Sequence, residues 1–207
     1  FEAGQRDAYS ENITQDKWLE TNLQLRFTEF NRLNITFENA IERYEGLDFN
    51  RNSLKINGEN SFIKWLPFGI FFQTGESINY DPDDPFLGWS NIYELSITFK
   101  PNKRFRIGFD FSKETFWENW GGKELWDYNV FRQRTVYQIS KTLSLRAILD
   151  YNHYYKKVFG SFLVSYVMRP GTVFFIGLDT NYEKGDFRRY TRTNYNFFLK
   201  FSYWWRM

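Results

Sequence analysis

The chain contains a single imidazole that could take part in proton transfer. His153 is the only His among the 207 residues, and the absence of Cys excludes thiol nucleophiles and thiolate metal sites. A Ser–His–acid hydrolase needs a serine hydroxyl beside its imidazole, and Ser161 and Ser165 follow in the next alternating segment. Any sheet brings such side chains near one another by chance. We therefore expect no enzyme activity and assign no catalytic residue, with an outer-membrane hydrolase kept as the third alternative.

An acidic turn contains three possible oxygen ligands close together in the sequence. Asp81, Asp83 and Asp84 belong to the sequence DPDDP, and carboxylate oxygens are ligands for calcium. Their spacing is not that of an EF-hand loop, so a solvated turn is favoured. The chain also lacks a phosphate-binding Gly motif and a zinc motif. We expect neither a metal nor a cofactor.

Charged residues recur at every second position of several segments, which places them on one face of a predicted sheet. They are Arg26, Glu38, Arg106, Asp110, Glu114, Arg132, Arg134, Arg146, Asp150 and Lys200. In a membrane barrel, a face of this kind lines the lumen. Its charges either pair into a network that fills a narrow barrel or line an aqueous pore and set its ion preference. Because unpaired burial of a charge is costly, we expect neighbours of opposite sign.

Tryptophans form the second recurring set. They are Trp18, Trp65, Trp89, Trp117, Trp120, Trp126, Trp204 and Trp205. We expect them near strand ends or in loops, as in the aromatic girdles at membrane interfaces. Four of them, Trp89, Trp117, Trp120 and Trp126, also fit a platform in the outer loops on which a sugar could stack. The segment 117–126, WENWGGKELW, is the best ligand-binding loop because Gly121-Gly122 gives it a flexible tip.

The elements that must position these residues are β-strands. Apolar and polar residues alternate strictly, as in Phe105, Ile107 and Phe109 against Arg106 and Asp110, which is the primary strand signal. The pattern predicts eleven strands over residues 17–207. Residues 159–168 and 172–183 are apolar on both faces in places, so the sequence does not decide which of their side chains lie on the apolar face of the sheet. Residues 1–16 are predicted to be an extracellular loop or a weak strand over 1–9.

The last predicted strand has one apolar face that continues almost to the chain end. Its residues are Tyr195, Phe197, Leu199, Phe201, Tyr203 and Trp205. Such a face suits the final strand of a soluble sandwich or lipocalin-like barrel. It equally suits the aromatic-ended strand that the barrel insertion machinery of an outer membrane reads.

Composition favours the membrane interpretation. The chain is 22% aromatic and 42% hydrophobic, yet its mean hydropathy is −0.60. An apolar outer face combined with a polar inner face explains both values. No run approaches the ~20 apolar residues of a membrane-spanning helix. The net charge of +2 is too small to indicate nucleic acid.

The predicted connections alternate in length. The shorter set is 29–32, 64–66, 100–104, 140–142 and 169–171, and the mostly longer set is 45–52, 81–90, 118–124, 156–158 and 183–190. Outer-membrane barrels have short periplasmic turns and long outer loops, so this sorting predicts a periplasmic C-terminus. Because single-chain barrels have even strand numbers, we expect at least one strand before Phe1 unless residues 1–9 supply it. The chain is therefore expected to be the C-terminal part of a longer barrel.

Three stretches near the end carry a family resemblance. They are LSLRAILDYNHYY (143–155), SYVMRPGTVFFIGLDTNY (165–182) and NFFLKFSYWWRM (196–207). The turn 169–172, the aromatic strand 173–178 and the closing segment 197–206 resemble the C-terminus of a family of Bacteroidota outer-membrane proteins of unknown function. Members of that family carry an N-terminal carbohydrate-binding-family-9-like domain before a large barrel. The resemblance implies further strands and such a domain upstream, and it supplies no site residues.

The sequence thus predicts an all-β, antiparallel, up-and-down transmembrane β-barrel in the cell outer membrane. The expected function is a channel or receptor for a solute, with glycan-derived compounds as one candidate class. The alternative is a plugged barrel that anchors or scaffolds an envelope protein complex. Expected partners are outer-membrane lipid and lipopolysaccharide, the insertion machinery and other envelope proteins, but no nucleic acid.

Overall fold

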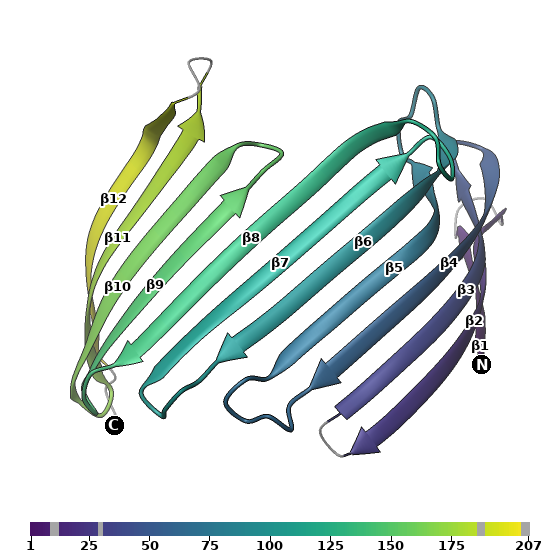
Figure 1. Ribbon diagram of the computed structural model, residues 1–207. Helices are drawn as coiled ribbons and strands as arrows, with labels where there is room; N and C mark the ends of the chain where they lie inside the picture. Colours follow the sequence, from purple (N-terminus) through teal and green to yellow (C-terminus); the bar gives the residue numbers. More distant parts are fainter. Residues whose placement is uncertain (9–12, 29–30, 186–188, 204–207) are drawn as a thin grey trace. The chain divides into compact units, whose positions relative to one another are not determined.

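The computed structural model describes residues 1–8, 13–28, 31–185 and 189–203, which form twelve β-strands. The strands are β1 (Glu2–Ala8), β2 (Ile13–Thr28), β3 (Asn31–Tyr44), β4 (Leu47–Asn60), β5 (Phe68–Asn79), β6 (Phe86–Phe99), β7 (Phe105–Trp117), β8 (Glu124–Gln138), β9 (Leu143–Asn152), β10 (Lys157–Arg169), β11 (Thr172–Lys184) and β12 (Tyr190–Tyr203). Each strand is hydrogen-bonded to the next in chain order, from β1 to β12 (Figure 1). No helix among the described residues is long and apolar enough to span a membrane.

The predicted all-β, up-and-down fold is confirmed. All eleven strands expected over 17–207 are present, and β2 begins earlier than expected, at Ile13. The first segment is the twelfth strand, because Glu2–Ala8 pairs in antiparallel register with β2. Of the two alternatives for residues 1–16, a strand is therefore the one that forms over residues 2–8.

The predicted sorting of connections by length is wrong. The expected long connection 45–52 is a two-residue turn, Glu45-Gly46, with φ angles of 46° and 78°. These values suit the type I′ turn that joins tightly paired strands. Asp48 to Asn52 pair with β3 instead of looping out. At the opposite strand ends, the expected short connection 64–66 extends over 61–67. These two connections break the strict alternation of lengths from which the periplasmic C-terminus is predicted.

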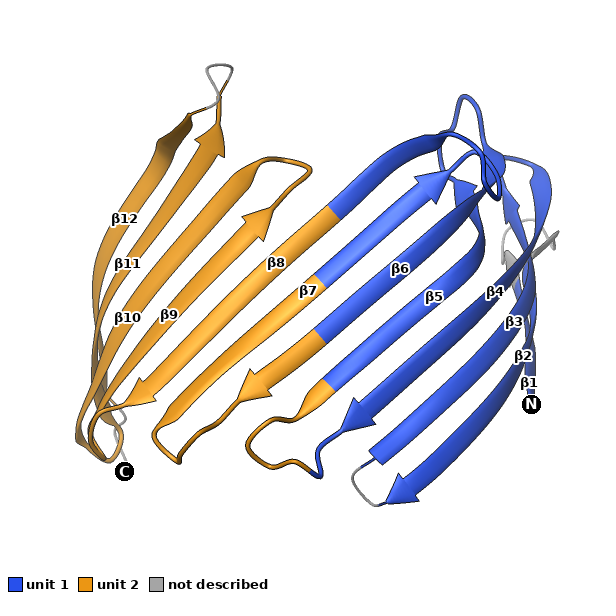
Figure 2. Ribbon diagram, viewed as in Figure 1, with its two compact units in different colours: residues 1–62, 69–95, 112–128 blue, residues 63–68, 96–111, 129–207 orange. Residues whose placement is uncertain are grey.

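The chain divides into two compact units, coloured separately in Figure 2. Unit 1 comprises residues 1–62, 69–95 and 112–128, and unit 2 comprises residues 63–68, 96–111 and 129–207. The two units are described separately below.

In unit 1, strand register separates two faces. Leu23 pairs with Ile35, and Ile35 pairs with Ile56, so these side chains share what we call the apolar face. The neighbouring positions Asn22, Thr36 and Lys55 share the opposite, polar face. The amide of Asn22 donates to the Thr36 hydroxyl at 2.7 Å, as expected for directly opposed residues.

Burial is inverted relative to a water-soluble sheet protein. On β3, Thr36 and Glu38 of the polar face are 8% and 9% exposed, whereas Phe37 and Ile41 of the apolar face are 49% and 42% exposed. Among the described residues, the buried apolar side chains are Ala40, Phe49, Ile78 and Phe116. A water-soluble fold of this size would bury its Leu, Ile and Phe residues far more completely.

One strand of unit 1 departs from strict alternation. Strict alternation along β5 would put Ile70 and Ile78 on one face, but Ile70 is 45% exposed while Ile78 is 4% exposed. Between them, Gly75 has a φ of 152°, a conformation that side chains rarely permit. A Cβ at this position would lie 2.2 Å from the Asn52 carbonyl oxygen. Gly75 is therefore an irregular position between an exposed and a buried isoleucine of the same strand.

In unit 2, pairing settles the facing of the two strands that the sequence left open. Leu145 pairs with Val164, Val164 with Ile176, and Ile176 with Leu199. Even positions of β10 and β11 therefore join odd positions of β9 and β12 on the apolar face. On the opposite face, Gly177 pairs with Phe198, and the aromatic ring lies against the glycine.

Candidate functional site

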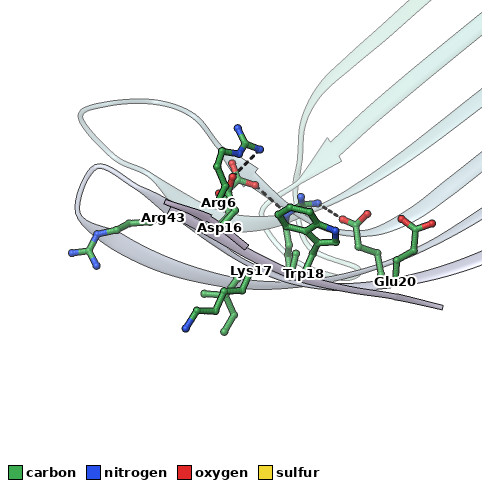
Figure 3. Close-up of a pocket in the computed structure, with 11 residues that line it drawn as sticks. Arg6, Asp16, Lys17, Trp18, Glu20 and Arg43 are labelled. Atoms are coloured by element: carbon green, nitrogen blue, oxygen red, sulfur yellow. Dashed lines mark hydrogen bonds and ion pairs between the residues drawn. The ribbon is translucent and has the colours of Figure 1, made fainter. Parts of the chain in front are cut away.

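The polar face of unit 1 contains a pocket of ≈ 420 Å³ lined by side chains of β1 to β4. Alternation on β2 places Asp16, Trp18 and Glu20 together on this face. Figure 3 shows these three with Arg6 on one side of the strand, whereas Lys17 points to the other side. The register of β2 with β3 brings Glu38, Ala40 and Glu42 opposite them. The pocket is thus a direct product of alternation on adjacent strands.

Glu38 is the centre of an ion-paired group on this face. Its carboxylate accepts contacts from Arg51 at 3.0 Å and from Lys55 at 2.5 Å. Arg51 also contacts Glu42 at 3.1 Å. Because Glu38 is only 9% exposed, its charge needs these partners. The predicted pairing of polar-face charges with neighbours of opposite sign holds at this residue.

A tyrosine beyond the end of β5 extends this group. The Tyr80 hydroxyl donates to Glu42 at 2.7 Å, and the Tyr44 hydroxyl donates to the Tyr80 carbonyl at 3.1 Å. Partial burial, followed by the hydrogen bond to the Glu42 carboxylate, raises the pKa of Tyr80 to about 12. The two hydrogen bonds join Tyr80, the first residue of the 80–85 connection, to β3.

Glu20 differs from the other acids of the pocket. It lies in register between Glu2 of β1 and Glu38 of β3. Within the described part of the chain, no ion pair or hydrogen bond joins Glu20 to a cation, whereas Asp16 contacts Arg6 at 2.8 Å. Like charges that face one another across strands are destabilising. The pocket therefore has an acidic side at Glu20.

Trp18 lies beside Glu20 on the polar face, two positions earlier on β2. Its neighbours across the strands are Gly4 and Ala40, which carry little or no side chain. A Cβ built on Gly4 would lie 2.1 Å from the indole of Trp18, so the ring lies directly on the β1 backbone. Ala40 is 4% exposed and forms the floor beside it. Because Gly4 and Ala40 are small, the polar face has room there for both the Trp18 indole and the pocket.

The predicted lumen-lining charges occupy the polar faces. Arg26 and Glu38 lie there in unit 1, and Arg132, Arg134, Arg146 and Asp150 lie at even positions of β8 and β9 in unit 2. Lys200 shares that face through its pairing with Phe175. Arg106 and Asp110 lie at even positions of β7 in unit 2, and Glu114 continues this alternation in unit 1.

Only some of the predicted lumen-lining charges contact a partner of opposite charge in the described structure. Arg132 donates to both carboxylate oxygens of Asp150, each at 2.8 Å, which is the strong bidentate geometry. Phe109 contacts Phe131 at 6.1 Å between ring centroids, so even positions of β7 and β8 share the other face. Within the described residues, Arg26, Arg134 and Lys200 have no ion pair.

The tryptophans are only partly where a girdle would place them. Trp18 and Trp126 were expected at an interface, but both occupy polar-face positions, and Trp126 stacks on Phe116 at 5.6 Å. Trp89 and Trp120 contact edge-on at 4.5 Å. Trp117 and Trp126 belong to β7 and β8, so the connection is 118–123. Among the described residues, ring contacts join Trp89 to Trp120 and Trp126 to Phe116. Trp204 and Trp205 lie outside the described residues.

The hydrolase candidates are not brought together. His153 is exposed in the turn after β9, and its Nδ1 lies 3.3 Å from the Tyr151 hydroxyl. Ser161 and Ser165 pair with Ile148 and Ser144 in the body of the sheet. Among the described residues, no group of three or more acidic, His or Cys side chains could hold a metal ion. Asp81 instead accepts a hydrogen bond from the Asp83 backbone within its own turn.

The closing strand is described as far as Tyr203. Tyr195, Phe197, Leu199, Phe201 and Tyr203 are between 49% and 60% exposed, and β12 pairs with β11 along its length. Trp205, the last member of the predicted apolar set, lies outside the described residues.

Sequence reasoning missed the residues that make the pocket. Glu20 and Glu42 are not among the charged residues that the sequence analysis selected. Trp18 was assigned to a girdle, and Arg51 was placed in a long loop. The available signal was alternation itself, because Trp18 shares its phase with Glu20 and Asn22. Its size and aromaticity suggested an interface, while register places it on the polar face.

Comparisons with known proteins find similarity among solved structures. The sequence matches no family model and no curated protein. Among solved structures, the chain is similar to one titled "CymD monoaromatic hydrocarbon channel", with 10% sequence identity and a TM-score of 0.37. The match covers 88% of this chain and 73% of that chain.

Proposed function

We propose that the chain is an integral outer-membrane β-barrel that conducts a small solute along its polar face. The observation that carries the proposal is the inverted burial. Phe37, Leu23 and Leu199 are 49%, 54% and 60% exposed, while Glu38 is 9% exposed. Lipid is the solvent in which such an apolar face is stable. Twelve up-and-down strands are also within the range of bacterial barrels.

The polar face supports a solute pathway in this proposal. Arg132, Asp150 and Arg51 combine charge with partial exposure, at 57%, 22% and 27% of their side chains. Partly exposed charges of both signs line aqueous pores and set their preference for ions or polar solutes. Glycan-derived compounds remain a candidate class, and the Trp89–Trp120 pair is where we propose their rings would first stack.

The proposed location is the outer membrane, with the C-terminus in the periplasm. The apolar set Tyr195 to Tyr203 of β12 is proposed to contact lipid and lipopolysaccharide. With Trp205, it is proposed to be the signal for the insertion machinery. The Bacteroidota family that the C-terminal motifs resemble stays part of this proposal. A single cysteine placed at Ser202 and labelled by a membrane-impermeant maleimide only after outer-membrane permeabilisation would support the orientation, and labelling of intact cells would contradict it.

Two measurements test the membrane barrel and the channel separately. A folded barrel should migrate faster in gel electrophoresis before heating than after it and should need detergent to stay monodisperse. A chain that is monodisperse without detergent would contradict the membrane proposal. In planar bilayers, the purified protein should produce stepwise conductance, and stable folded protein with no conductance would contradict the channel.

A second candidate function is a plugged barrel that anchors envelope proteins. The bidentate Arg132–Asp150 pair and the group around Glu38 favour it, since such pairs also fill narrow lumens. A non-conducting barrel that co-purifies with a fixed set of envelope proteins would support this function over the channel.

A further inference from the structure

We infer that the pocket on the polar face of unit 1 binds a small organic cation, with Trp18 covering it and Glu20 neutralising its charge. The pocket encloses ≈ 420 Å³, which is within the range of small-molecule sites. It is lined by one aromatic side chain and by charges of both signs. The inference deepens the proposed function by naming a solute class for this face.

The charge balance of the pocket indicates the sign of the ligand. The cations Arg6 and Arg51 are already engaged by Asp16 and by Glu38 and Glu42. Glu20 is the pocket acid that no cation of the described chain neutralises, and it stands in register beside Glu38. A bound cation would relieve that like-charge pairing. A bound anion would add to it.

The neighbouring indole indicates the kind of cation. Trp18 is two positions from Glu20 on the same face, and both line the pocket (Figure 3). Trp is the aromatic residue that attracts cations most strongly over its ring face, and quaternary ammonium groups are the usual ligands. The indole lies directly against Gly4 of β1, so the position of the ring is set before binding. Preorganised contacts of this kind strengthen binding.

A bare metal ion fits the site less well. The described residues contain no group of three or more potential ligands that could hold a metal, and the volume far exceeds that of one ion. Glu38 directs its two oxygens to Arg51 and Lys55, which leaves Glu20 as the available carboxylate. An alkylammonium group needs only one carboxylate and an aromatic face.

The test is a calorimetric titration of the full chain, folded in a non-ionic maltoside detergent. Zwitterionic detergents are unsuitable because they carry quaternary ammonium groups themselves. Choline chloride is the probe, and 3,3-dimethyl-1-butanol is its uncharged counterpart of the same shape. We expect choline to bind and the alcohol to bind at least roughly tenfold more weakly, since the shapes match and only the charge differs. Equal binding of both compounds, or no binding of choline, would overturn the inference.

Variants assign the binding to the pocket. Glu20→Gln should weaken choline binding roughly tenfold and Trp18→Leu several-fold, while Glu20→Asp should retain most of the affinity. The matched control is Glu59→Gln, which removes a carboxylate that pairs with Arg32 at 2.8 Å outside the pocket. Heat-modifiable migration confirms that each variant is folded. Wild-type affinity in Glu20→Gln would remove Glu20 from the site.

The outcome separates this inference from the channel proposal. Binding without conductance would support the pocket and contradict the channel. Conductance without choline binding would support the channel and contradict the pocket.

Discussion

At the scale of single residues, the polar face is organised by shared acceptors. Glu38 accepts from Arg51 and Lys55, and Glu42 accepts from Arg51 and Tyr80. Each carboxylate thus satisfies more than one donor, which suits a face where water is partly excluded. The chain of contacts from Lys55 to Tyr80 ties β3, β4 and the 80–85 connection together.

Tyr80→Phe tests the hydrogen bond between Tyr80 and Glu42. The variant removes the donor to Glu42, and because Tyr80 is 54% exposed we expect a loss of under about 1 kcal/mol at neutral pH. The pKa of Tyr80 is raised to about 12 from the ordinary value of 10.0 for a tyrosine. The unfolded chain therefore loses its phenolic proton at lower pH than the folded chain does. The stabilisation is fully present below pH 10 and is lost as pH rises from 10 to 12.

The measurement is the ultraviolet absorbance of phenolate across an alkaline titration, with unfolding curves at matched pH. The wild type should contain one late-ionising tyrosine that Tyr80→Phe lacks. Tyr93→Phe, which removes a phenol elsewhere in unit 1, is the control. If both variants lose the same ionisation, Tyr80 does not have the raised pKa.

At the scale of elements, glycines opposite aromatic rings set the local fit of neighbouring strands. Trp18 lies on Gly4 between β2 and β1, and Phe198 lies on Gly177 between β12 and β11. A ring that covers a glycine protects its exposed backbone and fixes the register of the two strands. Both pairs occur on the polar faces, at Trp18 with Gly4 and at Phe198 with Gly177.

Gly177→Ala tests this arrangement in unit 2. The added Cβ would lie 2.1 Å from Cζ of Phe198, so the ring must move, at a cost of roughly 1–3 kcal/mol. The double variant Gly177→Ala with Phe198→Leu should recover most of that loss. Unfolding in urea with the protein in lipid vesicles measures both.

Gly160→Ala is the matched control on β10, because its new Cβ would approach only Thr180, at 3.3 Å. It should cost clearly less than Gly177→Ala. Additive effects of the Gly177 and Phe198 changes would show that the ring and the glycine do not interact.

At the scale of the whole molecule, the inverted burial is the property that every functional proposal shares. In water, each exposed large apolar side chain forgoes roughly 1.5–3 kcal/mol of burial. The apolar faces of both units carry many such side chains, among them Leu23, Phe109 and Leu199. Contact with lipid removes that cost.

Two neighbouring substitutions on β2 test the contact with lipid. Leu23, on the apolar face, is 54% exposed, and Gln24 is exposed on the polar face. With lipid against the apolar face, Leu23→Arg should cost roughly 2–4 kcal/mol near the bilayer midplane, while Gln24→Arg should cost little. Urea unfolding in vesicles gives both values. Equal stability of the two variants would mean that Leu23 does not face lipid.

The sequence by itself determined the strands and most of their faces, because alternation is a local property of the backbone that each strand carries without reference to its neighbours. Leu33, Ile35 and Phe37 against Thr36 and Glu38 could be assigned in this way. For the short polar segment Glu2–Ala8 the sequence left a loop and a weak strand open, and its pairing with β2 decided for the strand.

Only the tertiary structure decided what depends on register between strands. The facing of β10 and β11 needed their pairing with β9 and β12, since both faces of their sequences are partly apolar. The turn Glu45-Gly46 replaced an expected long loop because Asp48 to Asn52 found partners on β3. The pocket combines Arg6, Trp18, Glu38 and Arg51 from four strands, and no single strand contains the information that brings them together.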